Sequence, residues 1–186
     1  MALVGSNGSG KTTLIKTIMD IHPNYKVDEI SFMGKNSDFK DPYFKENRLA
    51  AFSDYKAFRY WSFWEYAEFL YKIYGREIDE TYIESLMQGF NFNKYENYIL
   101  KDLSMVNVKK FYIIAALGLK LPFLVLDEPV DGLDFESTVF LYQELKKAAF
   151  RAAFFVFRNF SRVKLVIVRK KFRERKGDEY GIISRR

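Results

Sequence analysis

The sequence contains no cysteine and a single histidine among its 186 residues. Without cysteine the chain forms no disulfide, has no thiolate nucleophile and offers no cysteine-based metal site, and one histidine cannot make a histidine cluster. The longest uncharged apolar run, Phe111 to Leu119, is roughly half as long as the ~18 residues that a membrane-spanning helix needs. No basic and apolar leader opens the chain. We therefore expect a cytosolic protein whose chemistry uses carboxylates, lysine, hydroxyl groups or backbone amides.

Charge is distributed unevenly along the chain. The net charge is +6, but residues 151–186 hold 12 basic and three acidic residues, so this segment carries +9 and residues 1–150 carry −3. A basic segment with aromatic residues can bind nucleic acid or anionic lipid. We favour the simpler interpretation of a solvated surface segment with one strand at Leu165–Val168.

The length fits one domain, and its apolar periodicity predicts an α/β fold. We expect a folded domain over residues 1–150, with a mostly helical subdomain at about 58–119 inserted between strands, and a distinct basic, aromatic segment over 151–186. Strands are predicted at 1–4, 26–32, 49–53 and 123–126, and helices from 11 onward and within 58–74, 83–90 and 108–119.

A glycine-rich loop stands between the first predicted strand and the first predicted helix. Its sequence GSNGSGKT matches G-x-x-x-x-G-K-[ST] at every fixed position. Glycines let consecutive backbone amides point at phosphate oxygens, the lysine reaches the β- and γ-phosphates, and the following hydroxyl binds Mg²⁺. The candidate nucleotide-binding residues are Gly5, Ser6, Asn7, Gly8, Ser9, Gly10, Lys11, Thr12 and Thr13, with Thr12 also a metal ligand.

Two carboxylates follow the apolar run at 123–126. A phosphate loop needs a second acid to hold the metal, and Asp127 is placed to supply it at the end of a buried strand. Glu128, directly after it, is placed to orient or deprotonate an attacking water. We therefore predict Asp127 as a metal ligand and Glu128 as the catalytic carboxylate.

These motifs together resemble a known family. With Gly5–Thr12 as Walker A, Leu124–Glu128 as Walker B and Asp131–Asp134 as the D-loop, residues 1–147 resemble the ATP-binding subunit of an ABC transporter. The resemblance implies a P-loop NTPase of the ABC ATPase type, with a mainly parallel sheet flanked by helices and an inserted helical subdomain. It also implies a dimer in which each ATP is completed by the partner's signature helix.

The signature segment departs from the family pattern. The family reads Leu-Ser-Gly-Gly-Gln, whereas residues 103–107 read Leu-Ser-Met-Val-Asn. Val106 replaces the glycine that lets backbone amides approach a γ-phosphate, because its β-branched side chain blocks that approach. Ser104 remains as a donor to ATP bound by the partner.

Two further family residues are altered. Ser53, next to Asp54, stands where the family has a glutamine after its third strand. The family's histidine past Walker B is missing from the segment around residues 153–159, and His22 lies on the wrong side of the phosphate loop, so it is interpreted as an ordinary helix-end residue. In the family about two further strands precede the phosphate loop, whereas here the loop begins at the fifth residue. We expect a shortened, partly degenerate chain whose C-terminal segment arose by frameshift or gene decay.

The sequence therefore predicts an MgATP-binding subunit that resembles that of a bacterial-type ABC exporter, with weak or absent hydrolysis. The predicted cofactors are ATP and Mg²⁺. The predicted partners are a membrane-spanning transporter subunit and a second ATP-binding subunit, in a homodimer or a heterodimer, at the inner face of the cell membrane. Aromatic residues of 58–74 are divided between a core face and a socket for the membrane subunit. The alternative is a non-catalytic or relic nucleotide-binding protein, and a nucleic-acid ATPase is the least supported reading.

Overall fold

The computed structural model describes residues 2–4, 10–22, 25–26, 29–52, 57–149 and 153–158. Within these ranges the chain forms helices and strands in the following order. The helices are α1 (Lys11–Ile18), α2 (Pro42–Lys45), α3 (Phe63–Ile73), α4 (Glu80–Gly89), α5 (Met105–Gly118) and α6 (Phe135–Ala149), with short 3₁₀ turns η1 (Asn93–Tyr95) and η2 (Leu100–Asp102). The strands are β1 (Ala2–Val4), β2 (Ile30–Phe32), β3 (Lys35–Ser37), β4 (Arg48–Ala51), β5 (Phe123–Asp127) and β6 (Ala153–Arg158).

Four strands form a parallel sheet in the order β1-β6-β5-β4, and β2 and β3 form a separate antiparallel hairpin. The register aligns Val4 with Arg158, Phe157 with Asp127, and Leu126 with Ala51. The carboxyl ends of all four strands therefore lie along one edge of the sheet. Every segment that follows one of these strands starts from that edge.

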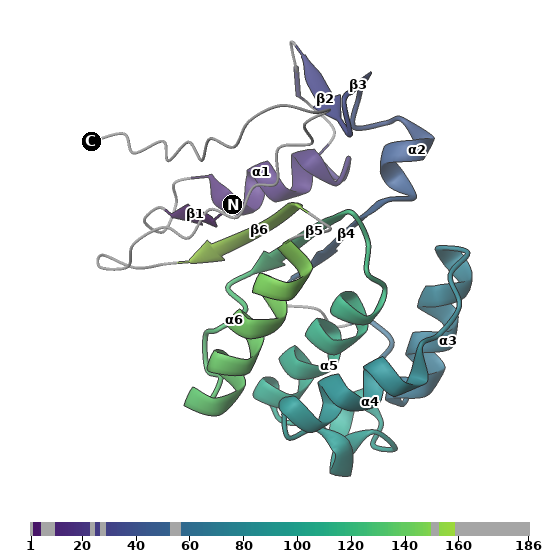
Figure 1. The fold of residues 1–186 in the computed structure, drawn as a ribbon, viewed down its shortest axis with the longest axis vertical. Coiled ribbons are helices and arrows are strands. Elements are labelled where there is room, and N and C mark those ends of the chain that lie inside the picture. Colours follow the sequence, from purple (N-terminus) through teal and green to yellow (C-terminus); the bar gives the residue numbers. More distant parts are fainter. Residues whose placement is uncertain are drawn as a thin grey trace, which may run out of the picture.

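Strand β5 divides the core in two because successive side chains of a strand point to opposite faces. Phe123 and Val125 join the cluster that contains Ile15 and Ile18 of α1. Leu124 and Leu126 join the larger cluster formed with α3, α4, α5 and α6. Figure 1 shows the result, with α1 on one face of the sheet, α5 and α6 on the other, and α3 and α4 beyond α5.

Helix α5 is apolar around nearly its whole circumference, which is typical of a helix buried on all sides. Nine of its residues, Lys110–Gly118, are buried. Helix α3 starts at a capping box, in which Ser62 and Glu65 bond each other's backbone and side chain. This box explains why α3 begins at Phe63 rather than at the predicted residue 58.

The α/β class, the parallel sheet and the helical stretch between strands are confirmed. Three details differ from the sequence prediction. Residues 35–37 form a strand, β3, where only a turn was predicted, and α5 begins at Met105 rather than at 108, because Ser104 caps it. Strand β6, which was not predicted, lies between β1 and β5. The division of the chain at residue 150 stays a prediction, and Leu165–Val168 lies outside the described residues.

None of the described helices is both long and apolar enough to cross a membrane.

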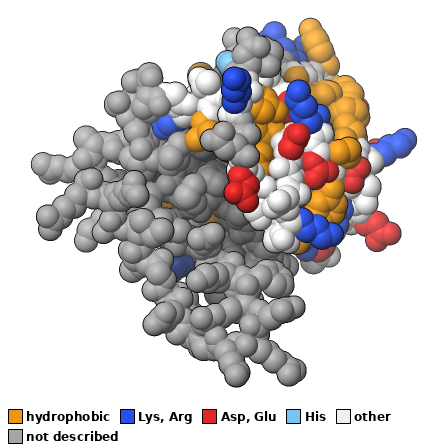
Figure 2. All heavy atoms as spheres, turned by 90° about the horizontal axis from the view of Figure 1, so that it is seen from above, with side chains coloured by type: hydrophobic (Ala, Val, Ile, Leu, Met, Phe, Trp, Pro, Cys, Tyr) orange, Lys and Arg blue, Asp and Glu red, His pale blue; other side chains and the backbone are white. Residues whose placement is uncertain are grey.

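On the face shown in Figure 2, basic and acidic side chains are interspersed over the described surface rather than separated by sign. Exposed apolar side chains lie between the charged ones on this face. This face therefore has no described patch of a single charge.

Gly89 lets α4 and α6 approach closely. A Cβ added at Gly89 would clash with the ring of Phe140, at 2.1–2.4 Å from three ring atoms, and this ring packs edge-to-face on Phe90. We expect Gly89→Ala to lower the free energy of unfolding by about 1–3 kcal/mol, because overpacking outweighs the gain in helix propensity that alanine brings. Urea denaturation measures this, and Ser85→Ala, at an exposed position of α4, is the control. In a Phe140→Ala background the cost should disappear, and an unchanged cost there would contradict the assigned clash.

Two tyrosines three residues apart should respond differently to loss of the hydroxyl group. The Tyr71 hydroxyl is buried against Gly118 with no hydrogen-bond partner among the described residues, and burial raises its pKa. The Tyr74 hydroxyl donates to the Arg48 carbonyl at 2.7 Å. Tyr71→Phe should leave stability unchanged or raise it, and Tyr74→Phe should cost about 1 kcal/mol. Thermal denaturation of both variants checks this, and a larger loss in Tyr71→Phe would refute it.

Candidate functional site

The N-terminus of α1 is arranged to receive an anion. Gly10 caps it with φ of 85°, a left-handed conformation that favours glycine, and a Cβ there would meet nothing within 4 Å. The cap makes no side-chain hydrogen bond, and the first turn carries no acidic residue. Lys11 is half-buried, and the Thr12 and Thr13 side chains are exposed. Backbone amides at a helix N-terminus and the positive end of the helix dipole suit a phosphate group.

The carboxyl end of β5 carries the two predicted acids. Asp127 is the last residue of the strand, and both Asp127 and Glu128 are half-buried. Glu128 has φ of 46°, which residues with a side chain rarely adopt and which is typical of functional sites. Its carbonyl accepts a hydrogen bond from the Asp131 amide at 3.2 Å, so the backbone turns sharply directly after the strand.

The sheet brings these two parts to the same edge. Val4 ends β1, which leads into the phosphate loop, and Asp127 ends β5 two positions away, with β6 between them. Among the described residues no group of three or more Asp, Glu or His side chains is placed to hold a metal. A threonine hydroxyl and one carboxylate nevertheless fit Mg²⁺, which prefers one or two carboxylates together with substrate phosphates. Thr12 and Asp127 would hold the ion, and when bound it would neutralise charge on the phosphates.

The signature segment lies at the start of α5. Ser104 is the N-cap, and its hydroxyl accepts a hydrogen bond from the Asn107 amide at 3.3 Å. Met105 is 88% exposed, whereas Val106 is half-buried, with its Cγ2 3.7 Å from the position that a Cβ would take on Gly132. Val106 thus packs against the D-loop of its own chain.

Two lysines of α5, neither of them predicted from the sequence, bond the segment between Glu128 and Asp134. The Lys109 ammonium group donates to the carbonyls of Glu128, at 3.0 Å, and Asp131, at 2.6 Å. Burial lowers the pKa of Lys109, and the nearby carboxylates of Asp131, Glu128 and Asp127 oppose this shift. The buried Lys110 donates to the Phe90 carbonyl and pairs with Asp134, both at 2.8 Å. The one sequence signal was two consecutive lysines in an otherwise apolar helix.

The remaining predicted residues divide into two groups. The phosphate-loop residues Gly5–Ser9, the pair Ser53 and Asp54, and Asn159 lie outside the described residues. His22 is half-buried just past the end of α1, and its Nδ1 has no hydrogen-bond partner in the described part of the chain. Its position after α1 agrees with the interpretation as a helix-end residue.

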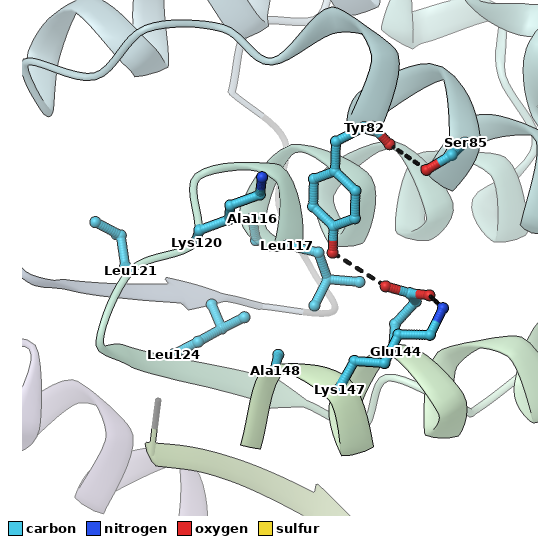
Figure 3. A pocket seen from close by; sticks show the side chains of 10 residues that line it. All are labelled: Tyr82, Ser85, Ala116, Leu117, Lys120, Leu121, Leu124, Glu144, Lys147 and Ala148. Carbon is cyan, nitrogen blue, oxygen red and sulfur yellow. Dashed lines mark hydrogen bonds and ion pairs between the residues drawn. The ribbon is translucent and has the colours of Figure 1, made fainter. Parts of the chain in front are cut away.

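A cavity of about 290 Å³ lies away from this edge, among α4, α5 and α6. Figure 3 shows Tyr82 and Glu144 pointing toward each other across it. The Tyr82 hydroxyl donates to Glu144 at 3.0 Å, and Lys147 pairs with the same carboxylate at 2.6 Å. Glu144 is 3% exposed, so these bonds satisfy a buried charge that joins α6 to the helical stretch. The cavity is not part of the nucleotide edge.

A family model described as ABC transporter matches residues 1–131 of the chain. The chain belongs to the ABC transporter family. It is 31% identical over 150 residues to the ABC transporter ATP-binding protein AlbC of Bacillus subtilis, covering 78% of this chain and 62% of AlbC. It is 28% identical over 149 residues to the spermidine/putrescine import ATP-binding protein PotA of Acetivibrio thermocellus, covering 78% of this chain and 42% of PotA. The chain thus spans less than two thirds of these relatives.

Solved structures agree on the fold. An ATP-binding subunit of an ABC transporter aligns with a TM-score of 0.74 at 20% identity, covering 85% of this chain and 66% of that structure. A second ATP-binding cassette, in its ADP conformation, aligns with a TM-score of 0.61 at 19% identity, covering 86% of this chain and 70% of the other. The ABC family assignment and the cassette fold predicted from the sequence are therefore confirmed.

Asp134 links the D-loop to α6 and to buried Lys110, so its ionisation should affect stability. The bond from Lys110, then the bond from the Ser137 amide, hold the pKa of Asp134 well below its ordinary value of 3.8. A depressed folded pKa means that this stabilisation is present above about pH 4 and is lost as the pH falls through the lower folded value.

We expect Asp134→Asn to lower the free energy of unfolding at pH 7 by about 1–3 kcal/mol, because it weakens the partner of a buried cation. The difference from the wild type should narrow below pH 4. Urea denaturation between pH 7 and pH 3 measures it, with the exposed Asp102→Asn as the control. A difference that stayed constant across this range would show that ionisation of Asp134 is not responsible.

Proposed function

We propose that this chain is the ATP-binding subunit of an ABC transporter and that it binds MgATP through Gly5–Thr13 and Asp127. One observation carries the proposal. The glycine-capped start of α1 follows β1, the two acidic residues stand at the end of β5, and both strands end at the same edge of one parallel sheet. Ligands of open parallel sheets bind at this edge. The relatives named as ATP-binding proteins support the same nucleotide.

In the proposed site each residue has a separate task. Backbone amides of Gly5–Gly10 and the N-terminus of α1 surround the phosphates, and Lys11 neutralises the β- and γ-phosphates. Thr12 and Asp127 hold Mg²⁺. Glu128 orients the water that attacks the γ-phosphate, and its half-buried position at the end of β5 suits that task.

Hydrolysis by two copies of this chain is proposed to be weak or absent. Val106 stands where the family's glycine approaches the partner's γ-phosphate, and its side chain instead packs near Gly132. Ser53 replaces the longer glutamine, and His22, the one histidine of the sequence, follows α1 rather than a strand past Walker B. A second ATP-binding subunit with an intact signature would complete the site of this chain, so we propose a heterodimer.

The proposed membrane partner is a transporter subunit that docks at the start of the helical stretch. The rings of Phe58, Trp61 and Phe69 pack together. The centroid of the Trp61 ring lies 4.7 Å from that of Phe58 and 5.1 Å from that of Phe69. Tyr60 is 71% exposed and Ile73 is 60% exposed beside them. Rigid, exposed aromatic and aliphatic side chains are suited to anchoring a partner helix. This partner would place the chain at the cytoplasmic face of the membrane.

MgATP binding and hydrolysis by the purified chain test this proposal. We expect calorimetry to show MgATP binding that Lys11→Ala weakens by at least tenfold, because the phosphates lose a charge-assisted contact. Lys16→Ala, an exposed lysine further along α1, is the matched control and should bind normally. Any slow hydrolysis should be abolished by Glu128→Gln with binding retained.

The outcomes separate the alternatives. Binding without turnover dependent on Glu128 supports a subunit that needs a partner for hydrolysis. Robust turnover by the chain alone would overturn the proposed impairment. A wild-type chain that binds no MgATP would favour the relic protein instead.

A further inference from the structure

The backbone at Glu128 is held from outside its own loop. Its φ of 46° places a residue with a side chain in the left-handed region, which must be stabilised by surrounding contacts. Within the loop, the Asp131 amide bonds the Glu128 carbonyl at 3.2 Å. From outside, the Lys109 ammonium group donates to the same carbonyl at 3.0 Å and to the Asp131 carbonyl at 2.6 Å. One lysine therefore ties both ends of the turn to α5.

This contact connects the turn at Glu128 to the start of α5, because Lys109 lies near that start. Helix α5 starts at Met105 with Ser104 as its cap, so Lys109 lies about one turn into the helix and two residues after the end of the signature segment. The side chain of Val106 approaches the same loop at Gly132. Residues 110–118 are buried, and one continuous helix connects the signature segment to Lys109. A displacement of the signature segment would be transmitted directly to the turn at Glu128.

We propose that Lys109 is a positioning residue for Glu128, and that through it the signature helix of this chain controls the direction of the catalytic carboxylate of the same chain. Lys109 contacts main-chain oxygens and not the nucleotide. When a second ATP-binding subunit engages residues 103–107, the shift of α5 is passed by Lys109 to Glu128, which belongs to the other ATP site of the dimer. The two ATP sites are thereby linked within one chain.

The neighbouring lysine has a different task. Lys110 is 4% exposed and bonds the Phe90 carbonyl and Asp134, so it fastens the far end of the D-loop to the core. Its removal would leave Asp134 and the start of α6 without their partner, which affects the whole fold. Only Lys109, among the described residues, bonds the Glu128 backbone from another element. This difference makes Lys109 the residue to test.

Hydrogen exchange of the full chain tests the link without requiring activity. Lys109→Met keeps most of the stem and removes the N–H donors, and Lys109→Arg restores charged donors. We expect amides of Asp131 and Leu133, which bond Glu128 and Val130, to exchange about tenfold faster in Lys109→Met and near the wild-type rate in Lys109→Arg. Amides of Ile113–Leu117 in α5 should stay unchanged. Lys146→Met, at an exposed lysine of α6, is the control.

Single-turnover hydrolysis of MgATP, with the protein in excess, tests the effect on Glu128. This part rests on the proposed function. We expect Lys109→Met to slow the single-turnover rate about tenfold with unchanged MgATP affinity, and Lys109→Arg to restore it. A binding role for Lys109 would instead weaken the affinity.

Each result bears on one claim. Unchanged exchange in Lys109→Met, or faster exchange throughout α5 that Lys109→Arg does not correct, would overturn the positioning role. So would faster exchange of the turn in Lys109→Met together with a single-turnover rate equal to a measurable wild-type rate, and if the wild-type chain shows no turnover the exchange data decide the positioning role. A wild-type chain that binds no MgATP would refute the proposed function, and the exchange data would then decide the link between α5 and Glu128 by themselves.

Discussion

Parallel pairing of β5 with a strand on each side is the constraint from which the remaining architecture follows. A parallel strand needs a crossover connection, so the segments before and after β5 have to cover the faces of the sheet. Alternation along β5 sends Phe123 and Val125 toward α1 and sends Leu124 and Leu126 toward α5 and α6. Because all four strands run the same way, the segments after Val4 and after β5 leave from one edge. The candidate nucleotide site exists because of this alignment, and neither motif alone would create it.

Burial of α5 sets the second level of organisation. A helix that is apolar around its circumference can carry polar groups only where other segments supply partners. Lys110 obtains them from Phe90 and Asp134, and Lys109 obtains them from the carbonyls of Glu128 and Asp131. The helix that supports the core therefore also fixes the backbone beside the acidic site. Stability and site geometry thus depend on neighbouring side chains of the same helix.

The sequence predicts those parts of the fold that depend on local patterns, and it misses those that depend on distant contacts. The run ending at Asp127 and the periodicity of the helices are local, and the structure forms a strand, β5, and helices at these places. Strand β6 was missed because its residues adjoin a strongly basic stretch whose composition suggested a surface segment. The bond from Lys109 to Glu128 joins residues 19 apart and depends on where α5 begins, which the Ser104 cap decides. No local pattern contains that information.

The change at Val106 has two consequences that belong to different chains of a dimer. Toward the partner, a β-branched side chain replaces the glycine that the family uses to approach phosphate, and the contact is weakened. Toward its own chain, the same side chain reaches Gly132 and adds an apolar contact beside the bonds of Lys109. One substitution therefore bears on two surfaces of α5: in the proposed dimer it alters the contact that the family makes with the partner's nucleotide, and within this chain it places a side chain beside the loop that follows Glu128.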